Sequence, residues 1–474
     1  MKKSIYRYLN RIIVIALLIS LMPGIAFGEP AGQDVTEVDV PNVSDQTGSI
    51  LPEMLTAVGA VVIESHTGKV LYGKQEHMRL YPASTTKTLT ALIAAEYGNL
   101  DELVTVGDEV NLIPWDSSKA GLTVNEKITL RDLVLGLMIN SGNDAANTIA
   151  VHIARKVSNK DLTTQEALDY FAELMNQRAR KAGALNSHFV NPHGYHDPDH
   201  YTTAYDLAMI GRDAMKNEFF MQAVSTTAMD TKYWETGETR YWRSKNKLLN
   251  KNDKEYYEYA TGGKTGYTSN AGQCLVTFAS KDGLDLIAVV LKSDHNCQWK
   301  ETRDILEYSF SNYEYHEVYK EGTIIQTLPV DNYASDDWGS LAVQISSKDW
   351  GDVFKKEDIS EIRQEIVWNS EYMSDKSTES MPRLDAPIYK GQQLGVLNIT
   401  LHGQLLASAP LTAVRDVKRK TVLDVLTPEP GEPGFGWIVF AGSILLVFIL
   451  LRITVMIINR RRRRRYYMYR KYKA

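Results

Sequence analysis

The chain has 474 residues, of which 44% are hydrophobic and 23% are charged, as is typical of a globular protein. This length is more than one ordinary domain needs and predicts two or three domains. The net charge of −5 is unevenly spread: residues before position 12 contribute +4, those from Arg452 onward contribute +10, and the section between carries −19. A strongly acidic central section argues against a nucleic-acid-binding protein.

The N-terminus has the three parts of a secretory signal. Basic residues precede an apolar run over 12–25, and small residues follow at positions 26 and 28. We expect a signal peptide over 1–28, cleaved after Gly28, because the apolar run is short and contains Pro23; an uncleaved anchor is the alternative. Residues 29–50 are polar and lack a clear period, which predicts a flexible leader.

In the chain order of the central section, strands occur early and late, with helices between them. A hairpin is predicted over 58–63 and 70–72, around a Ser-His-Thr-Gly turn. Apolar periodicity and capping residues then predict helices over 83–97, 129–139, 144–156, 165–182 and 203–216. Strands over 259–268, 273–280 and 284–291 and a helix over 298–310 complete the segment. This order predicts an α+β, three-layer domain over 51–320, with a sheet assembled from both ends of the domain.

From residue 321 the pattern changes to short strands. These are predicted over 322–328, 340–345 and 365–368, with a hairpin of 395–401 and 404–413 about His402-Gly403. We therefore expect a small β domain over 321–427. The Pro-rich segment 428–434 is expected to be a short, stiff linker, and there is no internal repeat.

The C-terminal sequence predicts a membrane span. Residues 434–451 carry no charge, and 18 residues of helix cover roughly 27 Å, close to the thickness of the hydrocarbon core. Six consecutive arginines, 460–465, follow and mark the cytoplasmic side. We expect a transmembrane helix over 435–458, a basic cytoplasmic tail over 459–474 and an extracytoplasmic bulk; a buried core helix is the alternative. The tail either stops transfer or also binds anionic lipid.

Three short motifs stand out, and the first is Ser84-Thr85-Thr86-Lys87 at the start of a predicted helix. Ser and Lys three residues apart lie on one helical face. A serine hydroxyl is a weak nucleophile without a base beside it, and a lysine amine is such a base when burial and neighbouring cations lower its pKa. Ser-x-x-Lys recurs at Ser244 to Lys247 in a highly charged stretch, which we interpret as a chance copy.

The second motif is Ser141-Gly142-Asn143, in the loop after the helix over 129–139, and the third is Lys264-Thr265-Gly266, inside a strand. In the second motif, Asn offers a hydrogen-bond donor and an acceptor to a peptide, and Ser can pass a proton. In the third motif, Lys and Thr can bind a substrate carboxylate, and Gly lets a substrate backbone approach the strand. Each three-letter motif is expected only about 0.1 times by chance at average residue usage. The ordered combination therefore carries the argument.

This ordered set resembles the signature of penicillin-binding proteins and serine β-lactamases. The chain is most similar to the low-molecular-mass penicillin-binding proteins, the serine-type D-Ala-D-Ala carboxypeptidases, because Ser-Gly-Asn replaces the Ser-Asp-Asn of class A β-lactamases. The stretches FVNPHGYHDPDHYTTAYDL (189–207) and GGKTGYTSNAGQCLV (262–276) also resemble that family. The resemblance is strong over about 50–320 and weak over 321–425, where it corresponds to the family's C-terminal β domain.

The resemblance implies a role for each motif residue. Ser84 is the acylated nucleophile, Lys87 is its base and Ser141 relays a proton toward the leaving amine. Asn143 holds the substrate amide. The terminal carboxylate is bound on the strand of the third motif, by Lys264, Thr265 and Gly266. The backbone N–H groups of Ser84 and Tyr267 form the oxyanion hole.

The implied activity is removal of the terminal D-Ala from peptidoglycan stem pentapeptides, with no metal and no cofactor, and with β-lactams as covalent inhibitors. A transpeptidase, a D,D-endopeptidase or a β-lactamase on the same scaffold is the alternative within enzymes. A catalytically dead, wall-binding membrane protein is the alternative outside them. A zinc site at His193, His196 and His200 is disfavoured because Pro and Gly interrupt the segment. Cys274 and Cys297 are expected as thiols, with one disulfide as the alternative.

Overall fold

The computed structural model describes residues 54–233, 235–421 and 436–471. The signal peptide predicted over 1–28, the leader over 29–50 and the linker over 428–434 therefore lie outside the described residues.

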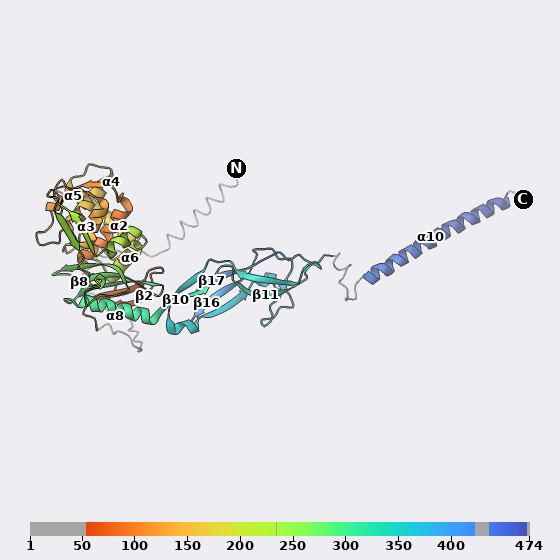
Figure 1. The fold of residues 1–474 in the computed structure, drawn as a ribbon. Helices are drawn as coiled ribbons and strands as arrows, with labels where there is room; N and C mark the ends of the chain where they lie inside the picture. The colour runs from red at the N-terminus through yellow and green to blue at the C-terminus, as the bar shows by residue number, and fades with distance from the viewer. Residues whose placement is uncertain (1–53, 234, 422–435, 472–474) are drawn as a thin grey trace, which may run out of the picture. The chain divides into compact units, whose positions relative to one another are not determined.

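The centre of the first domain is a five-stranded antiparallel sheet (Figure 1). Strand β1 pairs with β9, so that Val61 lies opposite Val289, and the sheet joins the two ends of the domain as expected. Its order is β2 (Val70–Lys74), β1 (Gly59–Glu64), β9 (Leu284–Ser293), β8 (Gly272–Lys281) and β7 (Ala260–Thr268).

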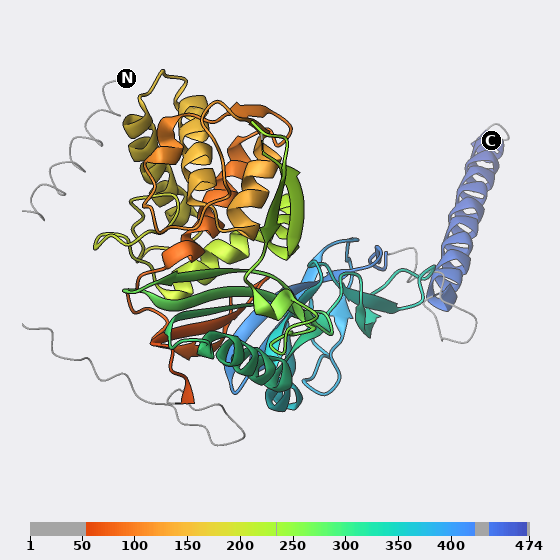
Figure 2. The ribbon, with the colours of Figure 1, turned by 60° about the vertical axis from the view of Figure 1, so that its left-hand side comes forward.

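Both faces of this sheet are covered, because its strands bury alternate residues in two separate cores. In β1, Val61 and Ile63 belong to the core on one face, and Ala60 and Val62 belong to the core on the other. Helix α8 (Cys297–Asn312) packs on the second face (Figures 1 and 2). The other helices lie on the first face, so the predicted three-layer α+β architecture is confirmed.

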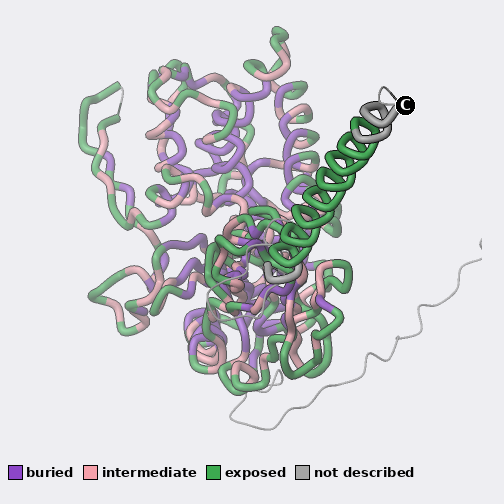
Figure 3. The backbone as a smooth tube through the Cα atoms, turned by 90° about the vertical axis from the view of Figure 1, so that its right-hand side faces the viewer, coloured by how far each residue is buried: buried purple, intermediate pink, exposed green. Residues whose placement is uncertain are grey.

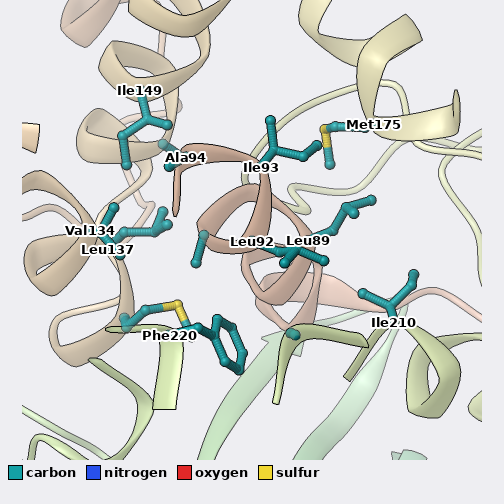
Figure 4. Packing of buried hydrophobic residues seen from close by; sticks show 14 of the residues in the cluster. Leu89, Leu92, Ile93, Ala94, Val134, Leu137, Ile149, Met175, Ile210 and Phe220 are labelled. Carbon is teal, nitrogen blue, oxygen red and sulfur yellow. The ribbon is translucent and has the colours of Figure 1, made fainter. Parts of the chain in front are cut away.

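Helix α2 (Lys87–Tyr97) lies at the centre of the helical layer, and its first eight residues are all buried. Figure 4 shows Leu89, Leu92, Ile93 and Ala94 among side chains of the surrounding helices. A helix packed on every side cannot rotate without disturbing the core, so the position of Lys87 is determined by packing. The neighbours are α3 (Leu130–Ile139), α4 (Asn143–Ser158), α5 (Thr164–Lys181), α6 (Ala204–Ala214) and α7 (Glu218–Ser225).

The predicted helix over 83–97 differs from expectation in its first turn, which is a 3₁₀ helix, η2 (Ala83–Thr86). The hydroxyls of Thr85 and Thr86 donate to the carbonyls of Pro82 and Ala83, three residues earlier. Such local side-chain bonds compete with the α-helical pattern.

Several short elements were not predicted. The strand pairs are β3 (Leu103–Thr105) with β4 (Lys127–Thr129), and β5 (Ala228–Lys232) with β6 (Thr239–Arg243). Helix α7 and the 3₁₀ helices η3 (Asp108–Asn111) and η4 (Lys247–Leu249) were not predicted either. Strand β6 is held by tertiary contacts: the guanidinium of Arg240 pairs with Glu126 at 3.0 Å, and the indole N–H of Trp242 donates to the Ala120 carbonyl.

A β-rich region follows α8, as predicted. Strands β10 (Tyr313–Tyr319) and β13 (Trp350–Lys355) form one pair. A six-stranded sheet has the order β14 (Arg363–Trp368), β16 (Gln393–Leu401), β17 (Gln404–Ala413), β12 (Ser340–Ile345), β11 (Ile324–Asp331) and β15 (Leu384–Asp385). Its 3₁₀ helices are η5 (Lys356–Glu361) and η6 (Ser370–Tyr372). The predicted hairpin turn at His402-Gly403 lies between β16 and β17.

The last described element is a single helix, α10 (Gly436–Lys471). Its segment Val439–Arg465 is long and apolar enough to cross a membrane, and none of it is buried against protein. Figure 3 shows this segment as exposed along its length. A core helix of a soluble domain would bury one face, so this observation favours the span over the alternative of a buried helix.

The buried ion pair of Arg240 and Glu126 generates a prediction about stability. Both side chains are at most 3% exposed, so Glu126→Ala leaves an uncompensated buried charge and should cost about 3–5 kcal/mol of unfolding free energy. The control is Asp101→Ala, which removes an exposed pair with Arg131 and should cost about 0–1 kcal/mol. Urea unfolding followed by tryptophan fluorescence measures both, and equal losses would contradict the prediction.

Candidate active site

Ser84 and Lys87 meet where the 3₁₀ turn enters α2. The Nζ atom of Lys87 lies 2.9 Å from Ser84 Oγ, 2.7 Å from Asn143 Oδ1 and 2.8 Å from the His193 carbonyl oxygen. Lys87 is wholly buried, whereas Ser84 is partly exposed. The first motif therefore places an accessible hydroxyl against a buried amine.

Burial lowers the pKa of Lys87 well below its ordinary value, and the charge of Lys264 lowers it further, while Asp144 acts in the opposite direction. A neutral amine has two N–H donors and one lone pair. The oxygens of Asn143 and His193 only accept, so they take the two N–H groups. The lone pair is then left for the Ser84 hydroxyl, and the amine can accept its proton.

Asn143 is held in place by the first turn of α4. Its N–H donates to the Ser118 carbonyl. The next residue, Asp144, is buried and accepts hydrogen bonds from the N–H groups of Ala120, Gly121 and Leu122 at 2.7–3.0 Å. This carboxylate ties the helix to the loop beside it, and so the amide of Asn143 stays against Lys87.

The second and third motifs are joined by Lys264, whose Nζ donates to Ser141 Oγ at 3.0 Å and to the Thr265 carbonyl at 2.9 Å. Ser141 adopts a left-handed conformation with φ of 57°, a strained backbone that is characteristic of functional sites. Since Asn143 is only two residues away, the pairs Ser84–Lys87 and Ser141–Lys264 belong to one site.

Gly266 brings strand β7 against the turn that carries Ser84. A Cβ atom at this position would lie 2.9 Å from the Pro82 carbonyl oxygen and 3.0 Å from the Ser84 nitrogen. From the sequence we assigned this glycine to the approach of a substrate backbone; in the structure the protein's own turn also packs closely against it. On the same strand, Thr265 is half-buried and the side chain of Tyr267 is 62% exposed.

Three residues that line a pocket beside the second and third motifs were not predicted from the sequence. A pocket is lined by Ser141, Lys264 and Thr265 together with residues of one further segment. That segment is Ser244, Lys245 and Asn246. The signal available in the sequence was the charged stretch before the third motif. We interpreted the Ser-x-x-Lys within that stretch as a chance copy and gave the stretch no role in the site.

Lys245 affects the chemistry of this pocket. Burial lowers the pKa of Lys264 to about 7, and the charge of Lys245 contributes to the lowering. The serine and lysine of the second Ser-x-x-Lys copy do not act as a pair: Ser244 Oγ accepts from the Asn246 N–H, and Lys247 Nζ lies over the Trp299 ring.

The histidines of the 189–200 segment make local contacts. His193 Nδ1 accepts from the Tyr195 N–H, and the His200 ring contacts Thr86 and Val190. Within the described ranges, no group of three or more His, Cys, Asp and Glu side chains is arranged to hold a metal ion. Cys274 and Cys297 are both free thiols.

Comparison with known proteins agrees with this site. Residues 46–295 match the family model described as D-alanyl-D-alanine carboxypeptidase, which is more than half of the chain. Residues 313–419 match the model of the penicillin-binding protein 5 C-terminal domain.

Relatives match over most of their length. D-alanyl-D-alanine carboxypeptidase DacF of Bacillus subtilis is 31% identical over 389 residues, which cover 79% of this chain and 90% of the relative. The crystal structure of penicillin binding protein 5 from Haemophilus influenzae aligns with a TM-score of 0.57 at 28% identity, over 78% of this chain and 100% of that one. The Streptomyces K15 DD-transpeptidase aligns with a TM-score of 0.50 at 33% identity, over 54% and 98%.

The predicted family, fold and enzyme class are thereby confirmed: this chain belongs to the serine-type D-alanyl-D-alanine carboxypeptidases, the low-molecular-mass penicillin-binding proteins.

Proposed function

We propose that this enzyme removes the terminal D-Ala from peptidoglycan stem pentapeptides through an acyl-enzyme on Ser84. The observation that carries the proposal is the 2.9 Å contact between Ser84 Oγ and the buried Lys87 amine. Burial lowers the pKa of that amine well below its ordinary value, which favours the neutral form that can accept a proton.

In acylation, Ser84 Oγ attacks the carbonyl carbon of the D-Ala–D-Ala bond while Lys87 accepts the hydroxyl proton. The backbone N–H groups of Ser84 and Tyr267 stabilise the resulting oxyanion. Ser141 relays the proton taken up by Lys87 to the leaving amine, the C–N bond breaks, and D-Ala departs. A water molecule then attacks the ester, which releases the shortened peptide and restores the Ser84 hydroxyl.

Substrate binding uses the other side of the pocket. Lys264 in its charged form and the Thr265 hydroxyl hold the terminal carboxylate, and Gly266 keeps that strand close to Ser84. Asn143 orients the peptide amide. Lys245 adds a second positive charge near the carboxylate site, which agrees with its effect on the pKa of Lys264. β-Lactams would acylate the same serine.

Transpeptidation is the second candidate, since one similar solved structure is titled a DD-transpeptidase. The two reactions share the acyl-enzyme and differ in whether water or an amine accepts the acyl group. Incubation with a stem pentapeptide and an acceptor amine separates them: loss of one D-Ala without cross-linked product supports the carboxypeptidase, and cross-linked product would overturn it.

Removal of the nucleophile tests the proposal directly. Ser84→Ala should abolish labelling by a fluorescent penicillin, and Lys87→Ala should reduce its rate by at least about 100-fold, because the base contribution is typically 10²–10⁴-fold. Ser346→Ala, at an exposed serine of the β-rich region, should still be labelled, and mass spectrometry should locate the adduct on Ser84. An unlabelled wild type, or equal labelling of Ser84→Ala, would overturn the proposal.

The pKa of Lys264 predicts a pH dependence. As pH rises through about 7, Lys264 loses its proton and carboxylate binding weakens, so kcat/KM for the peptide should fall above that pH. Lys245→Ala removes a positive charge that lowers this pKa, so the falling limb should move to higher pH. Lys247→Ala, whose amine lies over Trp299, is the control and should leave the limb unchanged. If Lys245→Ala left the falling limb of the kcat/KM profile in place or moved it to lower pH, the prediction would be wrong.

For location, we propose an exported enzyme anchored by α10, with its signal peptide over 1–28 removed after Gly28 and its basic tail in the cytoplasm. The arginines 460–465 support this orientation. Protease added to intact spheroplasts should digest the catalytic domain and spare an epitope tag placed after Ala474, and N-terminal sequencing should begin at Glu29. Digestion of the tag would contradict the proposed orientation.

A further inference from the structure

A buried hydrogen-bonded chain lies directly behind the nucleophile and is not explained by the reaction steps above. The Thr86 hydroxyl, between Ser84 and Lys87 in the chain, donates to the Ala83 carbonyl at 2.8 Å. The Nε2 atom of His200 lies 2.9 Å from the same hydroxyl oxygen, and the Val190 N–H donates to His200 Nδ1 at 3.1 Å. Thr86 and His200 are both at most 2% exposed.

The direction of every bond in this chain is determined. Because Val190 donates to Nδ1, that nitrogen has no proton, and the neutral ring carries its proton on Nε2. Nε2–H therefore donates to Thr86 Oγ1, and the threonine uses its own proton for the Ala83 carbonyl. Only this tautomer of His200 satisfies all three contacts.

The charge state of His200 is consistent with this role. Burial lowers its pKa to about 3, with further lowering by the charges of His188, Lys87 and His196. The ring is also packed edge-on against Phe189, with 5.4 Å between ring centroids. The ring thus remains a neutral donor at any pH well above 3.

The carbonyl at the end of this chain belongs to a strained residue. Ala83 has a φ of 49°, a left-handed conformation that costs a non-glycine residue about 1–2 kcal/mol. Such strain persists only where surrounding contacts determine it. Ala83 immediately precedes Ser84, so a relaxed Ala83 would redirect the nucleophile.

Gly194 closes the other side of the same carbonyl. A Cβ atom at this position would lie 1.8 Å from the Ala83 oxygen and 2.6 Å from Thr86 Oγ1. The loop of His193, whose carbonyl accepts from Lys87, is thereby pressed against the turn that carries Ser84. The Ala83 carbonyl is held between Thr86 and this loop.

We propose that His200 is a positioning residue for the reaction: acting through Thr86, it holds the strained Ala83 turn so that Ser84 Oγ stays within reach of Lys87. His200 contacts neither Ser84 nor Lys87 by a hydrogen bond in this structure. The inference rests on the proposed role of Ser84 as nucleophile.

The test is a double-mutant cycle on acylation by a fluorescent penicillin, with the full-length protein in detergent. His200→Ala should lower the acylation rate constant about 10–100-fold, since a displacement of about 1 Å can cost 10²-fold, with little change in the non-covalent dissociation constant. Thr86→Val should have a similar effect. Because His200 acts through Thr86, the double variant should be no slower than the slower single variant.

Two further variants separate positioning from general stability. His200→Gln keeps an amide N–H donor for Thr86 and should restore much of the rate, and Thr86→Val carries the test if His200→Ala does not fold. His188→Ala, a neighbouring histidine that contacts the Asp199 carbonyl, is the matched control. Thermal unfolding by circular dichroism accompanies each variant.

The inference is overturned if folded His200→Ala or folded Thr86→Val acylates at the wild-type rate, if His200→Gln is as slow as His200→Ala, if the effects of His200→Ala and Thr86→Val multiply, or if the rates merely follow thermal stability. These outcomes leave the proposed function intact, because the wild type is still acylated at Ser84. A wild type that is not acylated overturns the proposed function and this inference together.

Discussion

The contact between the Ser84 hydroxyl and the buried Lys87 amine is the interaction on which the rest of the site depends. A lysine in water is charged and cannot accept a proton, so the amine must be desolvated and placed near another cation, here Lys264, for its neutral form to be favoured. The helical layer supplies the desolvation, since α2 is packed on all sides. The two carbonyl-type partners, Asn143 and His193, supply the geometry.

The surrounding elements hold the Ser84 hydroxyl and the Lys87 amine in contact while leaving the hydroxyl accessible. Strand β7 approaches the 3₁₀ turn closely because Gly266 has no side chain. The carboxylate of Asp144 fixes the loop beside Asn143. The site thus lies between a rigid helix and a sheet edge, and each side contributes one lysine: Lys87 buried beside the proposed nucleophile, and Lys264 on the strand where we propose that the carboxylate binds.

Much of the fold and the site was predictable from local patterns. The strands of the main sheet and the helices other than α7 had clear apolar periods and capping residues, and the three motifs were recognisable from residue type and spacing. The short strands β5 and β6 were not predictable, because contacts distant in sequence stabilise them, such as those of Arg240 with Glu126 and of Trp242 with Ala120. Lys245 was overlooked because the charge of its segment, the signal present in the sequence, does not by itself indicate that the segment returns to line the pocket.

The sequence by itself determined the three-layer α+β class, the apolar C-terminal helix and the identities of the motif residues, because these depend on composition, period and spacing, and the resemblance of the ordered motifs indicated the family. Only the tertiary structure decided that residues 83–86 form a strained 3₁₀ turn, that Gly266 serves the approach of that turn, and that His200 reaches Thr86 from more than a hundred residues away. Burial, electrostatic interaction between lysines and hydrogen-bond direction are properties of atoms brought together in space, and a linear pattern does not contain them.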